Sequence, residues 1–418
     1  MSEIRKPAII LILITLFIDT MGIGIIIPVV PKLLKEMTGG GTTAYAALIG
    51  GFLAATYSVM QFACGPIFGG LSDRYGRRPI LLASLFGFGI DYTVTAFAPS
   101  LGWLFLARCI AGVLGASFTT GAAYISDIST PENRAQNFGL IGVAFGLGFI
   151  LGPVIGGLAS AYGESVGIDG TRMPFFVAAG FSLLNWAYAF FFMPESLKPE
   201  HRRKFEWRRA NPVGTFKSLF KVELIKQLFI ALTFVYLAAH AVQSNWSFFT
   251  DEQLGWGPKE IGFSLGVVGV VFAIVQGGLI RVIIPKLGQS RSVYVGLGLY
   301  ALGLLLYAFA TQNWMMYAFT VVYCMGGIAG PALQGIMASS VAPNAQGELQ
   351  GGFTSMMSLT SIFGPVLMNS VLFSYFTSSS APVYFPGIAM LVGALFCVVA
   401  TIIARKALNK PMAQPAAT

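Results

Sequence analysis

Twelve long apolar runs divide the sequence, and they constrain its fold more than any other feature. Each is at least as long as the roughly 20 residues with which a helix crosses the hydrocarbon core of a bilayer. Within lipid, only helices and closed barrels satisfy every backbone hydrogen bond, and runs of this length fit helices. The sequence therefore predicts an all-α integral membrane protein with twelve transmembrane helices. The runs lie near 8–30, 44–70, 79–98, 101–125, 135–161, 173–193, 224–249, 258–284, 292–311, 314–341, 348–376 and 382–404.

Composition and charge agree with this prediction. Hydrophobic residues make up 55% of the chain and charged residues only 10%, whereas soluble domains are about 25% charged. The net charge of +9 does not form one basic face, because nine of the 26 Lys and Arg residues lie between Lys198 and Lys226 and most of the others lie in alternate short loops. That distribution follows the positive-inside rule, places both termini in the cytoplasm and argues against a nucleic-acid partner.

Several other classes of protein are excluded by what the chain lacks. Four cysteines stand singly in apolar segments, at 64, 109, 324 and 397, and their spacing predicts neither a metal site nor a disulfide. No phosphate-binding G-x-x-x-x-G-K-[ST] stretch is present. We expect no cofactor and no enzymatic activity, and an ion gradient as the source of any work that the protein does.

An internal repeat divides the chain into two parallel six-helix halves. A shift of 212 positions aligns Arg74 with Lys286, Gly76 with Gly288, Gly115 with Gly327, and Pro153 with Pro365. Secondary transporters use such repeats and place the substrate site between them. The predicted organisation is an N-terminal half over 1–193, a basic cytoplasmic linker over 194–223 and a C-terminal half over 224–418.

The segment Gly69–Pro79 concentrates charge between the second and third runs. We expect a tight turn of eleven residues that acts as a charge-locked gate; the alternative is that its arginines only determine topology. Asp73 is expected to accept hydrogen bonds from a facing helix N-terminus. The candidate gating residues at cytoplasmic helix ends are Asp73, Arg74, Gly76, Arg77, Arg78, Asp127 and Arg134.

Three charged residues lie deep inside predicted membrane spans, more than a helical turn from either end. Asp19, Asp91 and Arg108 each cost on the order of 2.5–3.5 kcal/mol to insert into a bilayer, so a helix that only spans the membrane would not contain them. One reading is a buried ion pair that fastens the helices together. The other is a proton site, in which burial favours the neutral carboxyl group and the arginine favours the charged one. Which carboxylate dominates stays open.

Polar and aromatic residues inside the spans mark a candidate substrate cavity, although each of them also fits a packing role. His240 alone makes no metal site. These residues are Gln61, His240, Gln243, Asn245, Trp246, Phe272, Gln276, Tyr300 and Gln334.

The motifs resemble those of the major facilitator superfamily. Gly70-Leu-Ser-Asp-Arg-Tyr-Gly-Arg-Arg78 is similar to its helix 2–3 signature, and Arg108-xxx-Gly112-xx-Gly115 to its fourth-helix motif. The fifth run resembles the antiporter motif of the superfamily, at Gly148, Gly152, Pro153 and Gly156. The resemblance implies two halves that rock about a central cavity, with Asp73 locking the outward-open state.

Within the superfamily, the chain resembles the tetracycline/proton antiporters in segments such as Asp19-Thr-Met-Gly22 and Phe249-Thr-Asp251. That group carries a histidine in the eighth helix and an aspartate in the ninth, where this chain has Phe272 and Tyr300. The departure argues against a metal–tetracycline substrate and leaves the exporter class intact.

The resemblance implies a proton-coupled exporter of a hydrophobic or amphipathic small molecule. It also implies a monomer in a bacterial inner membrane whose partners are substrate, protons and lipid. The alternatives are a proton-coupled metabolite symporter or facilitator, and a transport-inactive scaffold or receptor.

Overall fold

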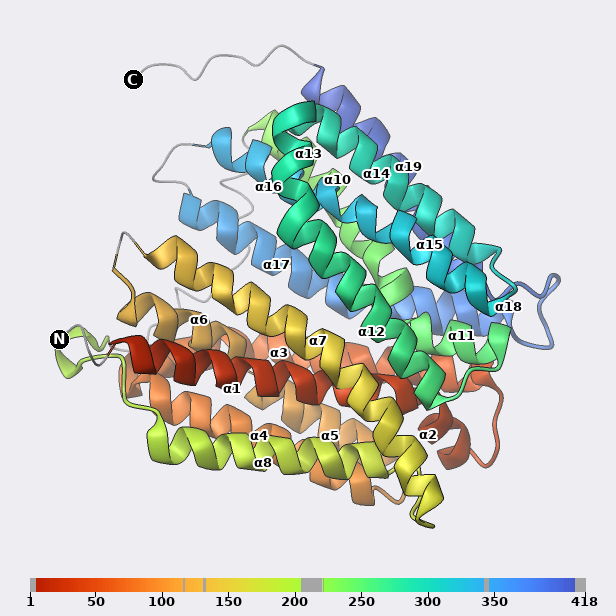
Figure 1. The fold of residues 1–418 in the computed structure, drawn as a ribbon, viewed down its shortest axis with the longest axis horizontal. Helices are drawn as coiled ribbons and strands as arrows, with labels where there is room; N and C mark the ends of the chain where they lie inside the picture. Colours follow the sequence, from red (N-terminus) through yellow and green to blue (C-terminus); the bar gives the residue numbers. More distant parts are fainter. Residues whose placement is uncertain are drawn as a thin grey trace. The chain divides into compact units, whose positions relative to one another are not determined.

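The computed structural model describes residues 5–115, 117–130, 133–203, 220, 222–341 and 346–409, and every regular element in these ranges is helical (Figure 1). Among the described residues, twelve segments are long and apolar enough to span a membrane, which confirms the predicted fold class. The first six comprise α1 (Arg5–Ile26) with α2 (Val30–Met37), α3 (Thr43–Tyr75), α4 (Arg77–Phe97), α5 (Leu101–Leu114) with α6 (Ser117–Ile128), α7 (Arg134–Ser165) and α8 (Met173–Phe192).

The second six contain more interruptions than the first. They comprise α10 (Glu223–Gln243) followed by α11 (Trp246–Leu254), α12 (Pro258–Ile274) with α13 (Ile280–Leu287), α14 (Gln289–Ala308), α15 (Asn313–Met325) with α16 (Ala329–Ser339), α17 (Gln346–Pro365) with α18 (Ser374–Phe376), and α19 (Ile388–Leu408). Wider π-helical turns join α12 to α13 at Val275–Leu279 and α17 to α18 at Val366–Phe373. Such π-helical turns often occur at functional sites.

The predicted eleven-residue turn between the second and third spans is wrong. α3 continues through Asp73 and Arg74 to Tyr75, and α4 begins at Arg77, so Gly76 alone separates the helices. Its φ of 108° is a conformation that L side chains rarely adopt. Gly288, which the 212-residue shift aligns with Gly76, separates α13 from α14 with a φ of 77°. α3 continues beyond its apolar run, so the charged residues Asp73 and Arg74 lie on a helix and not in a loop.

The linker predicted over 194–223 begins with a short 3₁₀ turn at Pro199–His201, and most of its remainder lies outside the described residues. The structure forms two compact units. The first consists of the described residues of Met1–Ala210, Trp246–Val270 and Pro365–Tyr384. The second consists of those of Asn211–Asn245, Val271–Gly364 and Phe385–Thr418. The boundaries predicted for the two halves remain a prediction.

Within the first unit, α1 packs most extensively on α7, and also on α8 and α6 (Figure 1). The glycines of the fifth span allow the α1–α7 approach. A methyl group added at Gly152 would lie 2.6 Å from the Met21 carbonyl oxygen, and one at Gly156 would overlap the Ile25 carbonyl. Pro153 Cδ in turn lies 2.9 Å from the position of a Cβ on Gly24. The antiporter-motif residues therefore form a close helix contact, as small residues do in membranes.

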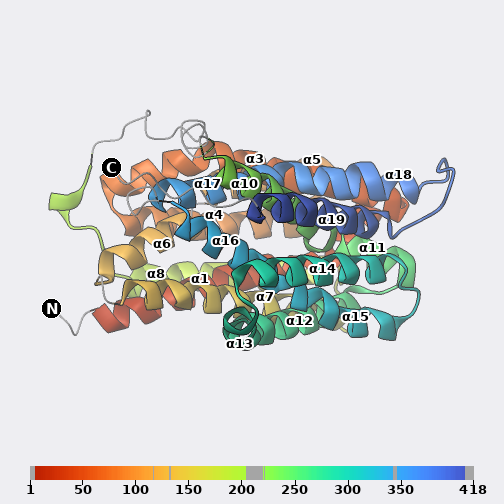
Figure 2. The same ribbon diagram turned by 90° about the horizontal axis from the view of Figure 1, so that it is seen from above.

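Within the second unit, α14 packs on α19, α15 and α16, and α19 also covers α10 (Figure 2). Glycines again permit the approach. A methyl group at Gly296 would lie 2.7 Å from the Ala329 nitrogen, and one at Gly303 would lie 2.5 Å from the Tyr323 Cα. Gly364 lies against the His240 ring, where no side chain would fit. His240 thus packs on α17.

Packing of α1 on α7 generates the first prediction. Gly152→Ala should lower the free energy of unfolding by about 1–3 kcal/mol, because an extra methyl group in a well-packed core destabilises the fold by this much. Gly146→Ala is the matched control on the same helix, since a methyl group there meets nothing within 4 Å. Thermal unfolding in detergent should show a lower midpoint for Gly152→Ala and an equal or higher one for Gly146→Ala. Equal losses in both variants would contradict the packing role.

Candidate proton-coupling site and charged helix junction

A break in the fourth span builds the polar centre of the first unit. α5 ends at Leu114 with Gly115 as its C-cap, and α6 begins at Ser117. The last carbonyl groups of a helix need partners from outside it. Ser84 Oγ donates to the Leu114 carbonyl, and Gln61 Nε2 donates to the Gly115 carbonyl at 3.1 Å. Gln61, predicted as a cavity residue, is therefore held by the backbone of the break.

The break also brings α6 to Asp19 on α1. The hydroxyl of Ser117, the first residue of α6, donates a hydrogen bond to Asp19 Oδ2. Both residues are buried, with 2% of Asp19 and 1% of Ser117 exposed. The buried carboxyl group of Asp19 therefore has a neutral hydrogen-bond donor, the Ser117 hydroxyl.

The second carboxylate pairs with the predicted arginine. Asp91 on α4 accepts a charge-assisted hydrogen bond from Arg108 Nη2 on α5 through Oδ2. The Asp91 side chain is fully buried, and its Oδ1 has no hydrogen-bond partner in the structure. A buried carboxylate with an unsatisfied oxygen is costly unless it has a functional use.

Two tyrosines join this polar centre, and they were missed in the sequence along with Ser117. Tyr57 OH accepts from Gln61 Nε2 at 3.0 Å. Tyr92 packs on α1, where a Cβ on Gly22 would lie 3.3 Å from its ring. Both interact electrostatically with Asp19, Asp91 and Arg108. Tyrosine and serine are common in apolar helices. The available sequence signals were that Tyr57 lies four residues before Gln61 and that Tyr92 directly follows Asp91.

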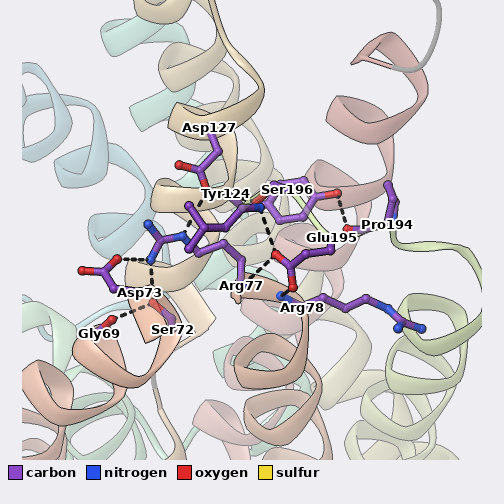
Figure 3. A network of polar contacts seen from close by, with 11 residues as sticks. Gly69, Ser72, Asp73, Arg77, Arg78, Tyr124, Asp127, Pro194, Glu195 and Ser196 are labelled. Atoms are coloured by element: carbon purple, nitrogen blue, oxygen red, sulfur yellow. Dashed lines mark hydrogen bonds and ion pairs between the residues drawn. The ribbon is translucent and has the colours of Figure 1, made fainter. Parts of the chain in front are cut away.

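At the junction of α3 and α4, the Arg77 side chain forms the centre of a network (Figure 3). Its Nη1 donates to Asp73 Oδ1 at 2.6 Å and to Ser72 Oγ at 2.7 Å. Its Nε donates to Asp127 Oδ2 on α6 at 3.0 Å. The guanidinium therefore holds α3, α4 and α6 together, with only 11% of the side chain exposed.

Glu195, just after α8, completes the junction and was missed because it was assigned to the linker. Its carboxylate accepts from the backbone N–H groups of Arg77 at 2.8 Å and Arg78 at 3.2 Å (Figure 3). These are first-turn donors of α4 without intrahelical partners, and the helix dipole favours a negative charge there. Glu195 thus caps the start of α4, and Asp73 binds Arg77. The expected contact of Asp73 with the N-terminus of a facing helix remains a prediction.

The remaining candidate gating residues lie at the same junction or beyond the described side chains. Arg78 donates to the Phe190 carbonyl at 2.6 Å, and Arg74 lies over the Tyr75 ring. Arg134 begins α7, but its side chain lies outside the described part.

Three cavity candidates of the second unit bind a tyrosine or the backbone. Tyr300 OH and Tyr323 OH share a hydrogen bond of 3.2 Å in a buried setting. Gln276 Nε2 donates to the Gly327 carbonyl, and Gln334 Nε2 donates to Tyr236 OH at 3.3 Å. These contacts support the packing alternative for those residues.

Four candidates have other surroundings. Trp246 Nε1 donates to Ser264 Oγ at 2.9 Å within the first unit. Phe272 is 42% exposed and Gln243 is also exposed. Asn245 is fully buried, and neither polar atom of its amide has a hydrogen-bond partner. Among the described residues, no group of His, Cys, Asp and Glu is arranged to hold a metal ion.

Comparison with known proteins identifies the family. The family model described as Major Facilitator Superfamily matches residues 12–291. A tetracycline resistance protein of class C from Escherichia coli is 37% identical over 387 residues, covering 93% of each chain. The chain belongs to the major facilitator superfamily.

Two further relatives extend this comparison. Multidrug resistance protein 2 of Bacillus subtilis is 29% identical, with 93% of this chain and 94% of that protein covered. The solved structure of a human organic anion transporter shares the fold with a TM-score of 0.70 at 22% identity, covering 96% of this chain and 99% of that one. The predicted resemblance to tetracycline/proton antiporters of the superfamily is thereby confirmed.

The cap on α4 generates a second prediction. Glu195→Ala should lower the free energy of unfolding by about 1 kcal/mol, because two N–H groups at the start of α4 lose their acceptor. Glu195→Gln, which keeps one acceptor oxygen and loses the charge, should fall between it and the wild type. Glu200→Ala, at an exposed position on the neighbouring 3₁₀ turn, is the control. Thermal unfolding checks the order, and an unchanged midpoint in Glu195→Ala would contradict the cap.

Proposed function

We propose that the protein is a proton-coupled exporter of a hydrophobic or amphipathic small molecule. The observation that carries this proposal is the pair of buried carboxylates, Asp19 and Asp91, with Arg108 bound to Asp91, in a superfamily member related to tetracycline and multidrug resistance proteins. A transport-inactive scaffold would have no use for two buried carboxylates, each costing several kcal/mol.

The chemistry of the site suits proton exchange. Burial favours the neutral form of a carboxyl group, whereas a hydrogen bond or a neighbouring cation favours the charged form. Asp19 has Ser117 as a neutral donor, and Asp91 has Arg108 as a cation. Asp19 is accordingly proposed as the better proton carrier, whereas Asp91 is held by Arg108.

Transport requires the site to face each side of the membrane in turn. We propose that both termini are cytoplasmic, that the six-helix halves rock about a central cavity, and that the Arg77 network holds the cytoplasmic ends of α3, α4 and α6 as one body. The substrate is proposed to contact Phe272, Gln243 and Asn245, whose side chains are exposed or lack partners. Tetracycline remains a candidate to be tested directly.

Proton exchange is the third prediction. In inside-out vesicles with a preformed proton gradient, addition of a transported drug should release protons, measured with a fluorescent pH indicator. The panel would include tetracycline and amphipathic dyes. Asp19→Asn should abolish the release while the protein still inserts, because an amide cannot carry the proton. Glu200→Gln is the exposed control.

Two outcomes would overturn the exporter proposal. The first is a panel in which no drug releases protons while a sugar or organic anion drives inward proton flow. The second concerns the site alone: normal proton-driven flux in Asp19→Asn would remove Asp19 from the mechanism.

An ion pair in the first unit links segments from the two halves of the sequence. Lys35 Nζ on α2 binds Asp251 Oδ2 on α11 at 2.6 Å, and Thr43 Oγ1 donates to the same oxygen at 3.1 Å. Nearby, Ser247 Oγ donates to the Ile27 carbonyl. If the halves rock, such contacts open in every cycle, whereas the Lys32–Glu164 pair, which joins α2 to α7 of the same half, persists.

This contrast is the fourth prediction. Lys35→Ala should raise several-fold the rate at which a cysteine at Ser247→Cys reacts with an impermeant maleimide from outside, in a background with the native cysteines replaced. Lys32→Ala is the matched control and should leave the rate unchanged. Equal rates in the two variants would show that the Lys35–Asp251 pair does not hold this end closed.

A further inference from the structure

A pocket of about 500 Å³ lies in the first unit, where the ends of α2, α7, α11 and α12 meet (Figure 1). Small-molecule sites in proteins measure roughly 300–1,000 Å³, so this pocket has room for a small organic molecule. Neither the proposed proton site nor the proposed substrate contacts include the residues that line it. The pocket therefore needs an explanation of its own.

Charged side chains line the pocket in equal numbers, three lysines and three carboxylates. Lys32 Nζ binds Glu164 Oε1 at 2.5 Å. Lys35 Nζ binds Asp251 Oδ2 at 2.6 Å. These two ion pairs use two positive and two negative charges. What the pocket can bind therefore depends on the remaining lysine and the remaining carboxylate.

The remaining carboxylate belongs to Glu260 and serves the helix that contains it. α12 begins at Pro258, and Glu260 Oε2 accepts a hydrogen bond from the backbone N–H of Gly257 at 3.1 Å. An acidic side chain in the first turn often caps a helix in this way, and the helix dipole favours its charge. The remaining lysine is Lys259. Its side chain is exposed and has neither an ion pair nor a hydrogen bond within the described part of the chain.

A buried hydroxyl group in the wall of the pocket is also without a partner. Ser160 on α7 is 1% exposed, and its Oγ forms no hydrogen bond with the residues that the structure describes. Most buried polar groups have a partner, because leaving one unpaired is costly. The unsatisfied groups of the pocket are thus an ammonium group and a hydroxyl group, and both can donate. We propose that the pocket binds an organic anion whose carboxylate or phosphate oxygens accept hydrogen bonds from Lys259 and Ser160.

The two donors lie on helices that pack closely on each other. A methyl group at Gly157, three residues before Ser160, would lie 2.7 Å from the Pro258 carbonyl oxygen. One at Gly262 would overlap the Pro153 carbonyl. The backbone of α7 therefore contacts the backbone at the start of α12 beside the pocket. Walls that are fixed before the ligand arrives reduce the ordering cost of binding.

A single bound anion joins the two halves of the sequence, because Ser160 belongs to the predicted first half and Lys259 to the second. If the halves rock as proposed, the anion has to leave before this end opens, as the Lys35–Asp251 pair has to break. Binding therefore favours the arrangement in which the pocket is intact. This consequence rests on the proposed transport cycle, whereas the binding itself does not.

Saturation-transfer NMR of the full-length protein in a neutral detergent tests the binding. Benzoate and phenyl phosphate are the probes, and benzamide is the neutral analogue, which should not bind. Lys259→Gln should weaken benzoate binding about fivefold, the upper range for an exposed charge pair, and Lys259→Arg should restore it. Ser160→Ala should weaken binding about tenfold, because a hydrogen bond from a buried group to a charged one contributes more.

Lys198→Gln is the matched control, because it removes the same charge at an exposed position outside the pocket. Unchanged benzoate affinity in folded Lys259→Gln and Ser160→Ala, or an equal loss in Lys198→Gln, would overturn the proposal. Nanodiscs distinguish the source of the anion. Benzoate binding that is weaker in phosphatidylglycerol than in phosphatidylcholine, and only when Lys259 is present, assigns a lipid headgroup; equal binding assigns a soluble anion. Both results retain the anion site.

The effect on opening is measured with the cysteine introduced by Ser247→Cys. Saturating benzoate should slow its reaction with an impermeant maleimide several-fold, and should not do so when Lys259→Gln is also present. An unchanged rate with benzoate bound would show that the anion does not hold this end closed. A drug panel without proton exchange would instead overturn the proposed function and leave the binding measurements interpretable.

Discussion

The need to satisfy every backbone carbonyl inside a bilayer governs the polar architecture of this protein. Where the fourth span breaks, the carbonyl of Gly115 is bound by Gln61. Where the tenth span narrows to a 3₁₀ turn at Gly326–Ile328, the carbonyl of Gly327 is bound by Gln276. The 212-residue shift aligns these two glycines. In each half, a glutamine from a neighbouring span therefore donates a hydrogen bond to a carbonyl group at the helix break.

The two breaks differ in what they place beside them. In the first unit the break leads to Ser117, which binds Asp19, and the same unit holds the Asp91–Arg108 pair. In the second unit the turn packs against Tyr300, which is bound to Tyr323. The same backbone device thus supports an ionisable centre in one unit and a neutral, aromatic one in the other.

Sequence reasoning succeeded where length and burial decide the outcome. The twelve spans follow from apolar runs that exceed the bilayer thickness, and Asp91 with Arg108 follows from the cost of unpaired charge in lipid. Sequence reasoning failed where a helix continues beyond its apolar run into the polar residues that follow. Charge at Asp73 and Arg74 suggested a loop, although a helix that emerges into water carries charge readily.

Sequence reasoning decides less where a side chain serves the backbone. Gln61 and Gln276 were predicted as cavity residues with a packing role as the alternative, and each donates a hydrogen bond to a backbone carbonyl. Glu195 was passed over because the N–H groups that donate to its carboxylate, at the start of α4, are distant in sequence. Such roles depend on where helices begin and end, which periodicity locates poorly. In a membrane protein the first question about a buried polar side chain is therefore which orphaned backbone group lies within its reach. Among the described residues, Asp91 Oδ1 and the amide of Asn245 have no hydrogen-bond partner, and this supports the proposal that they serve transport.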